Sequence, residues 1–201
     1  MKEKFKISDF QEVDLWTFRS ESGIGNPIYY LQVRRLDKLT GNSGDDYNFR
    51  VPYENMENEF AEGLAREIDD RNFLHVISPP TDEIFPKKYR ETIMATLGIC
   101  SDLTHIMGRN PNIKAAHDKT KLDDLINSYY LKSVHPLDKI DSLLIVDDIF
   151  SEGKTAKAML AFLQKCGLKK EAKIGIACAL KIVPPQRPSI KESMGLFDQY
   201  L

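Results

Sequence analysis

The chain of 201 residues has little of several features that mark whole classes of protein. Its three cysteines, Cys100, Cys166 and Cys178, are an odd number at wide separations, so they give no disulfide framework and no paired metal-ligand spacing. It has no apolar run of 18 residues, and its start, Met1 to Lys6, lacks the apolar segment of a signal peptide. A formal net charge of -2 gives no general attraction to nucleic acid or to anionic membranes. We therefore expect a cytoplasmic protein that binds neither membranes nor, directly, nucleic acid.

Composition predicts one domain with smaller appended segments. A hydrophobic content of 42% over this length is enough for a substantial core. Residues 1–55 are rich in aromatic, β-branched and turn residues, which indicates a small β-rich cap or hood. An extension of the main sheet or a dimerisation surface explains the same pattern. We place the core at residues 56–183 and a C-terminal tail at residues 184–201, after a proline-rich stretch.

Helical and strand patterns alternate within the predicted core. Phe60, Leu64 and Ile68 form one helical stripe, and an apolar strand over residues 73–78 stops at two prolines. A further helical face lies within residues 156–163, and a buried strand is predicted over residues 172–182. This alternation predicts an α/β fold with an open, mostly parallel sheet flanked by helices.

The most informative segment is the run from Leu143 to Thr155. Residues 143–146 are four consecutive apolar residues, which is typical of a strand buried on both faces. Asp147 and Asp148 follow at its carboxyl end, and a polar turn then begins a helical pattern. Ligands of open α/β sheets bind outside the carboxyl ends of strands, and a helix N-terminus favours phosphate. The run therefore predicts a ligand that carries both hydroxyl and phosphate groups.

This run resembles the signature of the type I phosphoribosyltransferases: an apolar strand, two acids, two variable residues and a short loop that ends in Gly-x-Thr. The resemblance implies a type I phosphoribosyltransferase fold in which Asp147 and Asp148 lie by the ribose hydroxyls of phosphoribosyl pyrophosphate (PRPP). It also implies a loop that holds the 5-phosphate, and Ser151, with the two acids, as a catalytic residue. The loop comprises Ile149, Phe150, Ser151, Glu152, Gly153, Lys154 and Thr155.

Glu152 departs from this family pattern, because a small residue such as Thr usually stands there. A carboxylate beside a phosphate is repulsive unless its side chain turns outward, and Lys154 would partly offset the charge. A plain first-turn acid favoured by the helix dipole is the alternative explanation. A Walker P-loop is excluded, because the glycine it requires five residues before Gly153 is replaced by Asp148.

The resemblance also suggests a site for pyrophosphate. In the family, the loop after the first core strand approaches this group, and Lys87, Lys88 and Arg90 follow the corresponding prolines. A solvated basic helix start is the other explanation for these residues. Arg109, Lys114 and Lys121 belong either to a flap over PRPP or to an exposed loop. The order of segments is most similar to the ComF-like competence branch, although the Gly-Phe-Asn-Gln run of that branch is absent.

Two functions remain open at this stage. The first is a phosphoribosyltransferase that binds PRPP with Mg²⁺, releases pyrophosphate and transfers phosphoribosyl to a nitrogenous acceptor; Mg²⁺ then enters with PRPP and has no direct protein ligand. The second is a non-catalytic sensor of PRPP or a nucleotide monophosphate, or an interaction subunit in DNA uptake or a defence system. Ser151 stands where purine-using relatives can carry an acidic base, which argues against purine salvage. A homodimer or a protein partner is compatible with both functions.

Overall fold

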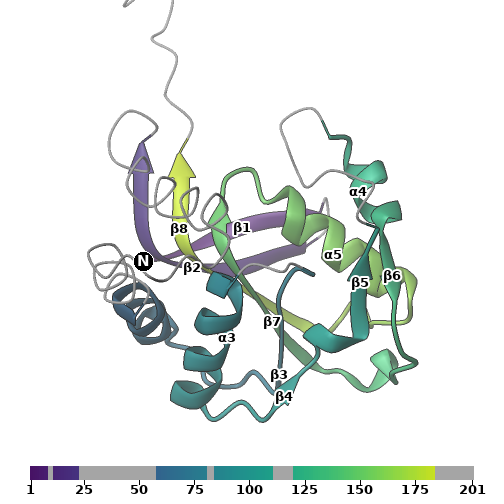
Figure 1. Ribbon diagram of the computed structural model, residues 1–201, viewed down its shortest axis with the longest axis horizontal. Coiled ribbons are helices and arrows are strands. Elements are labelled where there is room, and N and C mark those ends of the chain that lie inside the picture. The colour runs from purple at the N-terminus through teal and green to yellow at the C-terminus, as the bar shows by residue number, and fades with distance from the viewer. Residues whose placement is uncertain (9–10, 23–57, 81–83, 111–119, 184–201) are drawn as a thin grey trace, which may run out of the picture.

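The computed structural model describes residues 1–8, 11–22, 58–80, 84–110 and 120–183. Its main sheet has six strands in the order β1-β2-β8-β7-β3-β4 (Figure 1). β1 and β2 pair antiparallel, and every other neighbouring pair is parallel. These strands are β1 (Lys2–Ser8), β2 (Gln11–Ser22), β3 (His75–Ile77), β4 (Ser101–Asp102), β7 (Ser142–Phe150) and β8 (Lys173–Val183). The predicted α/β fold with an open, mostly parallel sheet and flanking helices is confirmed.

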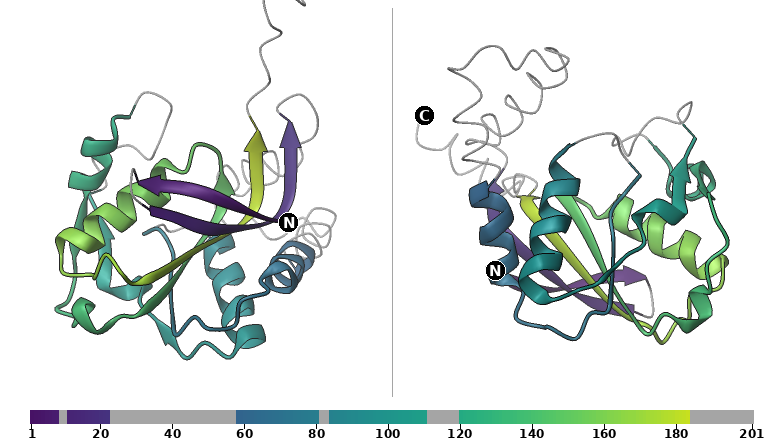
Figure 2. Two further views of the ribbon diagram at one scale, coloured as in Figure 1. Left: turned by 180° about the vertical axis from the view of Figure 1, so that it is seen from behind. Right: turned by 60° about the horizontal axis from the view of Figure 1, so that its bottom comes forward.

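Helices cover both faces of this sheet, which explains why the central strands are apolar throughout. On one face, α5 (Lys154–Lys165) packs in a cluster that contains Leu143, Ile145 and Ile176. On the other face, α3 (Ile84–Leu97) and a helix over residues 58–67 pack in a second cluster with Leu144 and Val146. Figure 2 shows these helices on opposite sides of the strands. The predicted helical faces are confirmed, since Phe60, Leu64, Ile68, Ala156, Met159, Leu160 and Leu163 are all buried.

The chain order places a topological switch point between two central strands. β3 leads through α3 to β4 at one edge of the sheet, whereas β7 leads through α5 to β8 in the opposite direction. β3 and β7 are direct neighbours, with Ile77 opposite Ile145. Two βαβ units that diverge from adjacent strands leave a crevice beyond the carboxyl ends of those strands. By this rule the crevice is expected between Ser78, which follows β3, and Asp147, near the carboxyl end of β7.

A smaller two-stranded sheet stands beside α5. β5 (Met107–Arg109) pairs antiparallel with β6 (Tyr129–Leu131), and Arg109 lies opposite Tyr129. α4 (Leu122–Ser128) leads directly into β6. The 3-10 helices η1 (Thr104–Ile106) and η2 (Leu137–Lys139) complete the described elements of this part of the chain.

The N-terminal strands belong to the main sheet. β2 pairs in parallel with β8 from Asp14 to Ser22, and Trp16 is fully buried, with its indole N–H donating to Asp69 at 2.9 Å. β1 forms the edge of the sheet beyond β2. The β-rich character predicted for this region is confirmed as a hairpin that extends the sheet. Residues 23–57 and the tail at 184–201 lie outside the described residues, so the hood and the domain boundaries stay predictions.

Candidate functional site

The paired acids lie at the carboxyl end of β7, on the switch-point crevice. Asp148 is buried, with 4% of its surface exposed, and Asp147 is half-buried. The amide of Asp148 donates to Asp147 Oδ1 at 2.9 Å, and the amide of Ile149 donates to Asp148 Oδ1 at 2.8 Å. Each carboxylate therefore accepts the amide that follows it, which fixes its orientation at the end of the strand.

Two titratable side chains lie near these acids. Cys178 is opposite Asp147 in the ladder, and burial, together with the charges of Asp147 and Asp148, raises the pKa of its thiol. Burial also raises the pKa of the Tyr129 hydroxyl; the charge of Asp147 adds to this shift, and Arg109 opposes it. Cys178 is therefore a protonated core thiol at neutral pH, as predicted, rather than a nucleophile.

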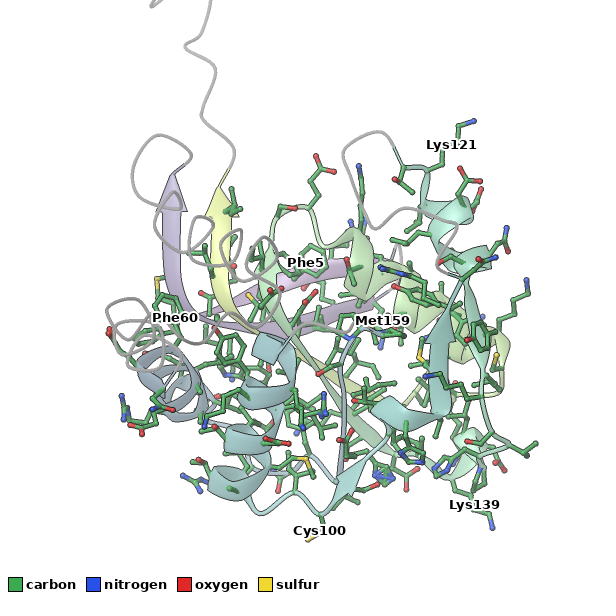
Figure 3. The ribbon with its side chains drawn as sticks, viewed as in Figure 1. Phe5, Phe60, Cys100, Lys121, Lys139 and Met159 are labelled. Carbon is green, nitrogen blue, oxygen red and sulfur yellow. The ribbon has the colours of Figure 1, made fainter. Side chains whose placement is uncertain are left out.

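The turn after β7 depends on Gly153, which ends the turn and caps α5. Its φ of 68° lies in the left-handed region, which side chains other than glycine rarely adopt. A Cβ built on Gly153 would lie 2.5 Å from Phe5 Cζ and 2.7 Å from Phe150 Cζ. These two aromatic rings pack edge to face, with centroids 4.8 Å apart. Phe5 of β1 lies beside this turn in Figure 3, so the edge strand supports the candidate phosphate loop.

Beyond Gly153 the helix begins with amides that have no carbonyl partner within it. The first amide of α5 in the regular pattern is that of Lys157, which donates to Gly153 O at 2.9 Å. The amides of residues 154–156 precede it, and such amides at a helix start attract anions. Thr155 is half-buried at this end, and Ser151 is exposed. The two acids and the helix start thus stand on the same short segment.

The Glu152 side chain points outward. It is 58% exposed, and its Oε2 lies 3.1 Å from Lys154 Nζ. The carboxylate and the ammonium therefore largely cancel each other at the rim of the turn. A phosphate-binding role for the loop requires such an outward carboxylate, but here the carboxylate engages the positive charge of Lys154.

The three cations predicted for pyrophosphate all lie on α3. Lys87 Nζ lies 3.9 Å from Glu91 on its own helix, and Lys88 is half-buried on α3. Arg90 is buried, and its Nε donates to Asp102 Oδ2 at 2.8 Å. Of the segment suggested as a flap, Arg109 lies on β5, Lys121 precedes α4, and residues 111–119, which include Lys114, lie outside the described residues.

The structure brings residues to the crevice that the sequence did not suggest. Ser78 follows β3, the strand beside β7, and its amide donates to Thr104 Oγ1 at 2.9 Å. Thr104 and Phe5 are far from the acids in the sequence, and neither belongs to a recognisable motif. The prolines after Ser78 were the one local signal, since they end a central strand.

Comparison with known proteins gives a likeness in structure at low sequence identity. No family model matches the chain, and no curated protein matches it. Among solved structures, a hypoxanthine phosphoribosyltransferase from Staphylococcus aureus is similar at 10% sequence identity and a TM-score of 0.38. The likeness covers 64% of this chain and 75% of that chain. The function proposed below rests on the strand order and the site geometry instead. Among the described residues, no helix is long and apolar enough to span a membrane.

Proposed function

We propose that the chain binds PRPP with Mg²⁺ and transfers its phosphoribosyl group to a nitrogenous acceptor, releasing pyrophosphate. The observation that carries this proposal is the position of the acid pair. Asp147 and Asp148 lie near the carboxyl end of β7, one of the two strands that flank the switch point, and the glycine-capped start of α5 follows that strand after a short turn. This position suits a ligand with vicinal hydroxyls for the carboxylates and a phosphate for the amides.

In the proposed complex, the amides at residues 153–155 and the hydroxyls of Ser151 and Thr155 bind the 5-phosphate. Asp147 and Asp148 accept hydrogen bonds from the ribose hydroxyls and stabilise the positive charge that develops on the sugar as pyrophosphate departs. The acceptor nitrogen then attacks the anomeric carbon. Positioning and electrostatics supply the rate, so no protein nucleophile is required.

Mg²⁺ fits this scheme as part of the substrate. It prefers oxygen ligands and is commonly held by substrate phosphates with one or two carboxylates nearby, and the acid pair supplies carboxylates at this edge. When bound, it neutralises charge on the departing pyrophosphate. Lys87, Lys88 and Arg90 stay our predictions for contacts with that group, and the contacts of Arg90 lead to a further role argued below.

The identity of the nitrogenous compound that accepts the phosphoribosyl group stays open. Ser151, in place of an acidic base, argues against a purine. A hood formed by residues 1–55 is proposed to select the acceptor, and a homodimer or protein partner is compatible with the exposed edge strand β1. A cytoplasmic location is part of the same proposal, because PRPP chemistry belongs to nucleotide metabolism.

The test measures PRPP binding by calorimetry, with and without Mg²⁺. Asp147→Ala with Asp148→Ala should weaken binding at least tenfold, because charge-assisted hydrogen bonds contribute about 1.5–3 kcal/mol each. Asp138→Ala is the matched control, since Asp138 is exposed on η2, before the amino end of β7. Pyrophosphate release is then assayed across a panel of nucleobases. Unchanged PRPP affinity in the double variant would refute the proposal.

A second candidate function is a non-catalytic sensor of PRPP or of a nucleotide monophosphate, or an interaction subunit in DNA uptake or a defence system. The ion pair between Glu152 and Lys154 favours it, because that pair reduces the positive charge available beside the loop. Tight binding of PRPP with no pyrophosphate release for any acceptor would select this function. Assignment to the ComF-like branch stays a prediction that rests on segment order alone.

A further inference from the structure

We infer that Arg90, Asp102 and Thr104 are positioning residues that hold the segment 78–80 against the switch-point crevice. This inference rests on the proposed function, which needs a wall for pyrophosphate at the end of β3. It gives Arg90 a role exerted through Asp102, besides the contact with pyrophosphate that is predicted for it.

Three hydrogen bonds link these residues in series. Arg90 Nε donates to Asp102 Oδ2 at 2.8 Å, and the amide of Thr104 donates to Asp102 Oδ1 at 2.8 Å. Thr104 Oγ1 then accepts the amide of Ser78 at 2.9 Å. Both oxygens of one carboxylate are thereby used, one by α3 and one by the segment that follows β4.

The last bond in this series is the one that fixes the segment. Pro79 and Pro80 have no amide hydrogen, so Ser78 carries the final N–H donor before residue 81. The Ser78 side chain is fully buried, and its hydroxyl has no hydrogen-bond partner in the described part of the chain. The hydrogen bond from the Ser78 amide to Thr104 Oγ1, rather than the Ser78 side chain, therefore sets where the chain leaves the sheet.

Because these three hydrogen bonds are partly buried, they are costly to break. Arg90 has 9% of its surface exposed, and the ion pair side chains of Arg90 and Asp102 are 11% and 34% exposed. No water replaces the acceptor that a buried amide loses. The chain must therefore shift, or the protein loses stability because a buried donor stays unsatisfied. The segment beside Asp147 and Asp148 should then move away from its binding position.

The test compares Thr104→Val, which removes the acceptor at nearly constant volume, with Thr104→Ser, which keeps it. Thr96→Val, an exposed position on α3, is the matched control. Amide exchange of Ser78 is followed by NMR, and calorimetry measures affinity for two probes, magnesium pyrophosphate and ribose 5-phosphate. If Thr104→Val does not fold, Thr104→Ala is measured in its place.

We expect Thr104→Val to speed exchange at Ser78 and to weaken pyrophosphate binding about tenfold, with ribose 5-phosphate changed less than about twofold. Thr104→Ser should restore both readouts. Unchanged exchange would show that Thr104 does not hold Ser78, and faster exchange with unchanged pyrophosphate affinity would show that the segment serves no ligand. Either result overturns the inference while PRPP binding by the unaltered chain stands. An unaltered chain that binds neither probe removes the proposed function, and this inference with it.

Discussion

Replacing Gly153 with alanine should destabilise the protein by two separable effects. The first is backbone strain, because a residue with a Cβ at φ 68° costs about 1–2 kcal/mol. The second is a clash, because the new Cβ would lie 2.5 Å from Phe5 Cζ and 2.7 Å from Phe150 Cζ. Overpacking of this kind costs about 1–3 kcal/mol. The sum is about 2–5 kcal/mol of unfolding free energy.

Gly98→Ala separates the two effects. Gly98 has φ 72°, close to that of Gly153, but a Cβ there would meet nothing within 4 Å. It should therefore show the strain alone, about 1–2 kcal/mol. Unfolding free energies from urea titration give both values. The difference between them measures the cost of the clash with Phe5 and Phe150.

Phe5→Leu combined with Gly153→Ala should recover part of the stability that the clash removes, because the shorter leucine side chain no longer reaches the new Cβ. PRPP affinity should fall in Gly153→Ala, since the loop amides must shift, and should stay unchanged in Gly98→Ala. Equal losses of stability in the two alanine variants would refute the reasoning, because they would show that Phe5 and Phe150 yield without cost.

Three further outcomes are expected. Glu152→Gln should tighten PRPP binding by about two- to fivefold, more at low salt, because it removes a negative charge beside the candidate phosphate loop; weaker binding would contradict this. Tyr129→Phe should leave stability in urea unchanged or raise it by about 1 kcal/mol, because the buried hydroxyl has no hydrogen-bond partner among the described residues. Burial and the charge of His135 lower the pKa of His75 below its ordinary 6.5. Between that lowered pKa and 6.5 the unfolded chain binds more protons than the folded chain, so the free energy of unfolding should fall as pH drops below about 6.5. His75→Gln should flatten this dependence of stability on pH.

Local patterns predicted the elements that carry the site. The apolar run before Asp147 can be buried on both faces only as a central strand, and β7 is that strand. The stripe after Gly153 has helical spacing, and α5 buries it. The acids, the turn and the helix start follow from adjacent residues, so the sequence predicts them together.

What the sequence could not predict depends on strand order. That β3 lies beside β7, and that β1 and β2 extend the sheet past β8, are set by pairing between distant segments. The placement of Phe5 against Gly153 follows from that pairing. The contact of Arg90 with Asp102 is of the same kind, because it joins α3 to the end of β4 and no periodicity encodes it.

The two walls of the crevice are held by different kinds of contact, and this difference bears on how each can respond to a ligand. Aromatic packing holds the turn at Gly153: Phe5 and Phe150 pack edge to face, and this packing resists a closer approach of the turn. Hydrogen bonds in series hold Ser78, and these fix direction as well as distance. A site that binds a phosphate at one end and releases pyrophosphate at the other needs both ends preformed, because each ångström of misplacement slows the reaction. Because the contacts given for the two walls within the described residues have no residue in common, we expect that each wall can be altered without the other and that their effects on binding add.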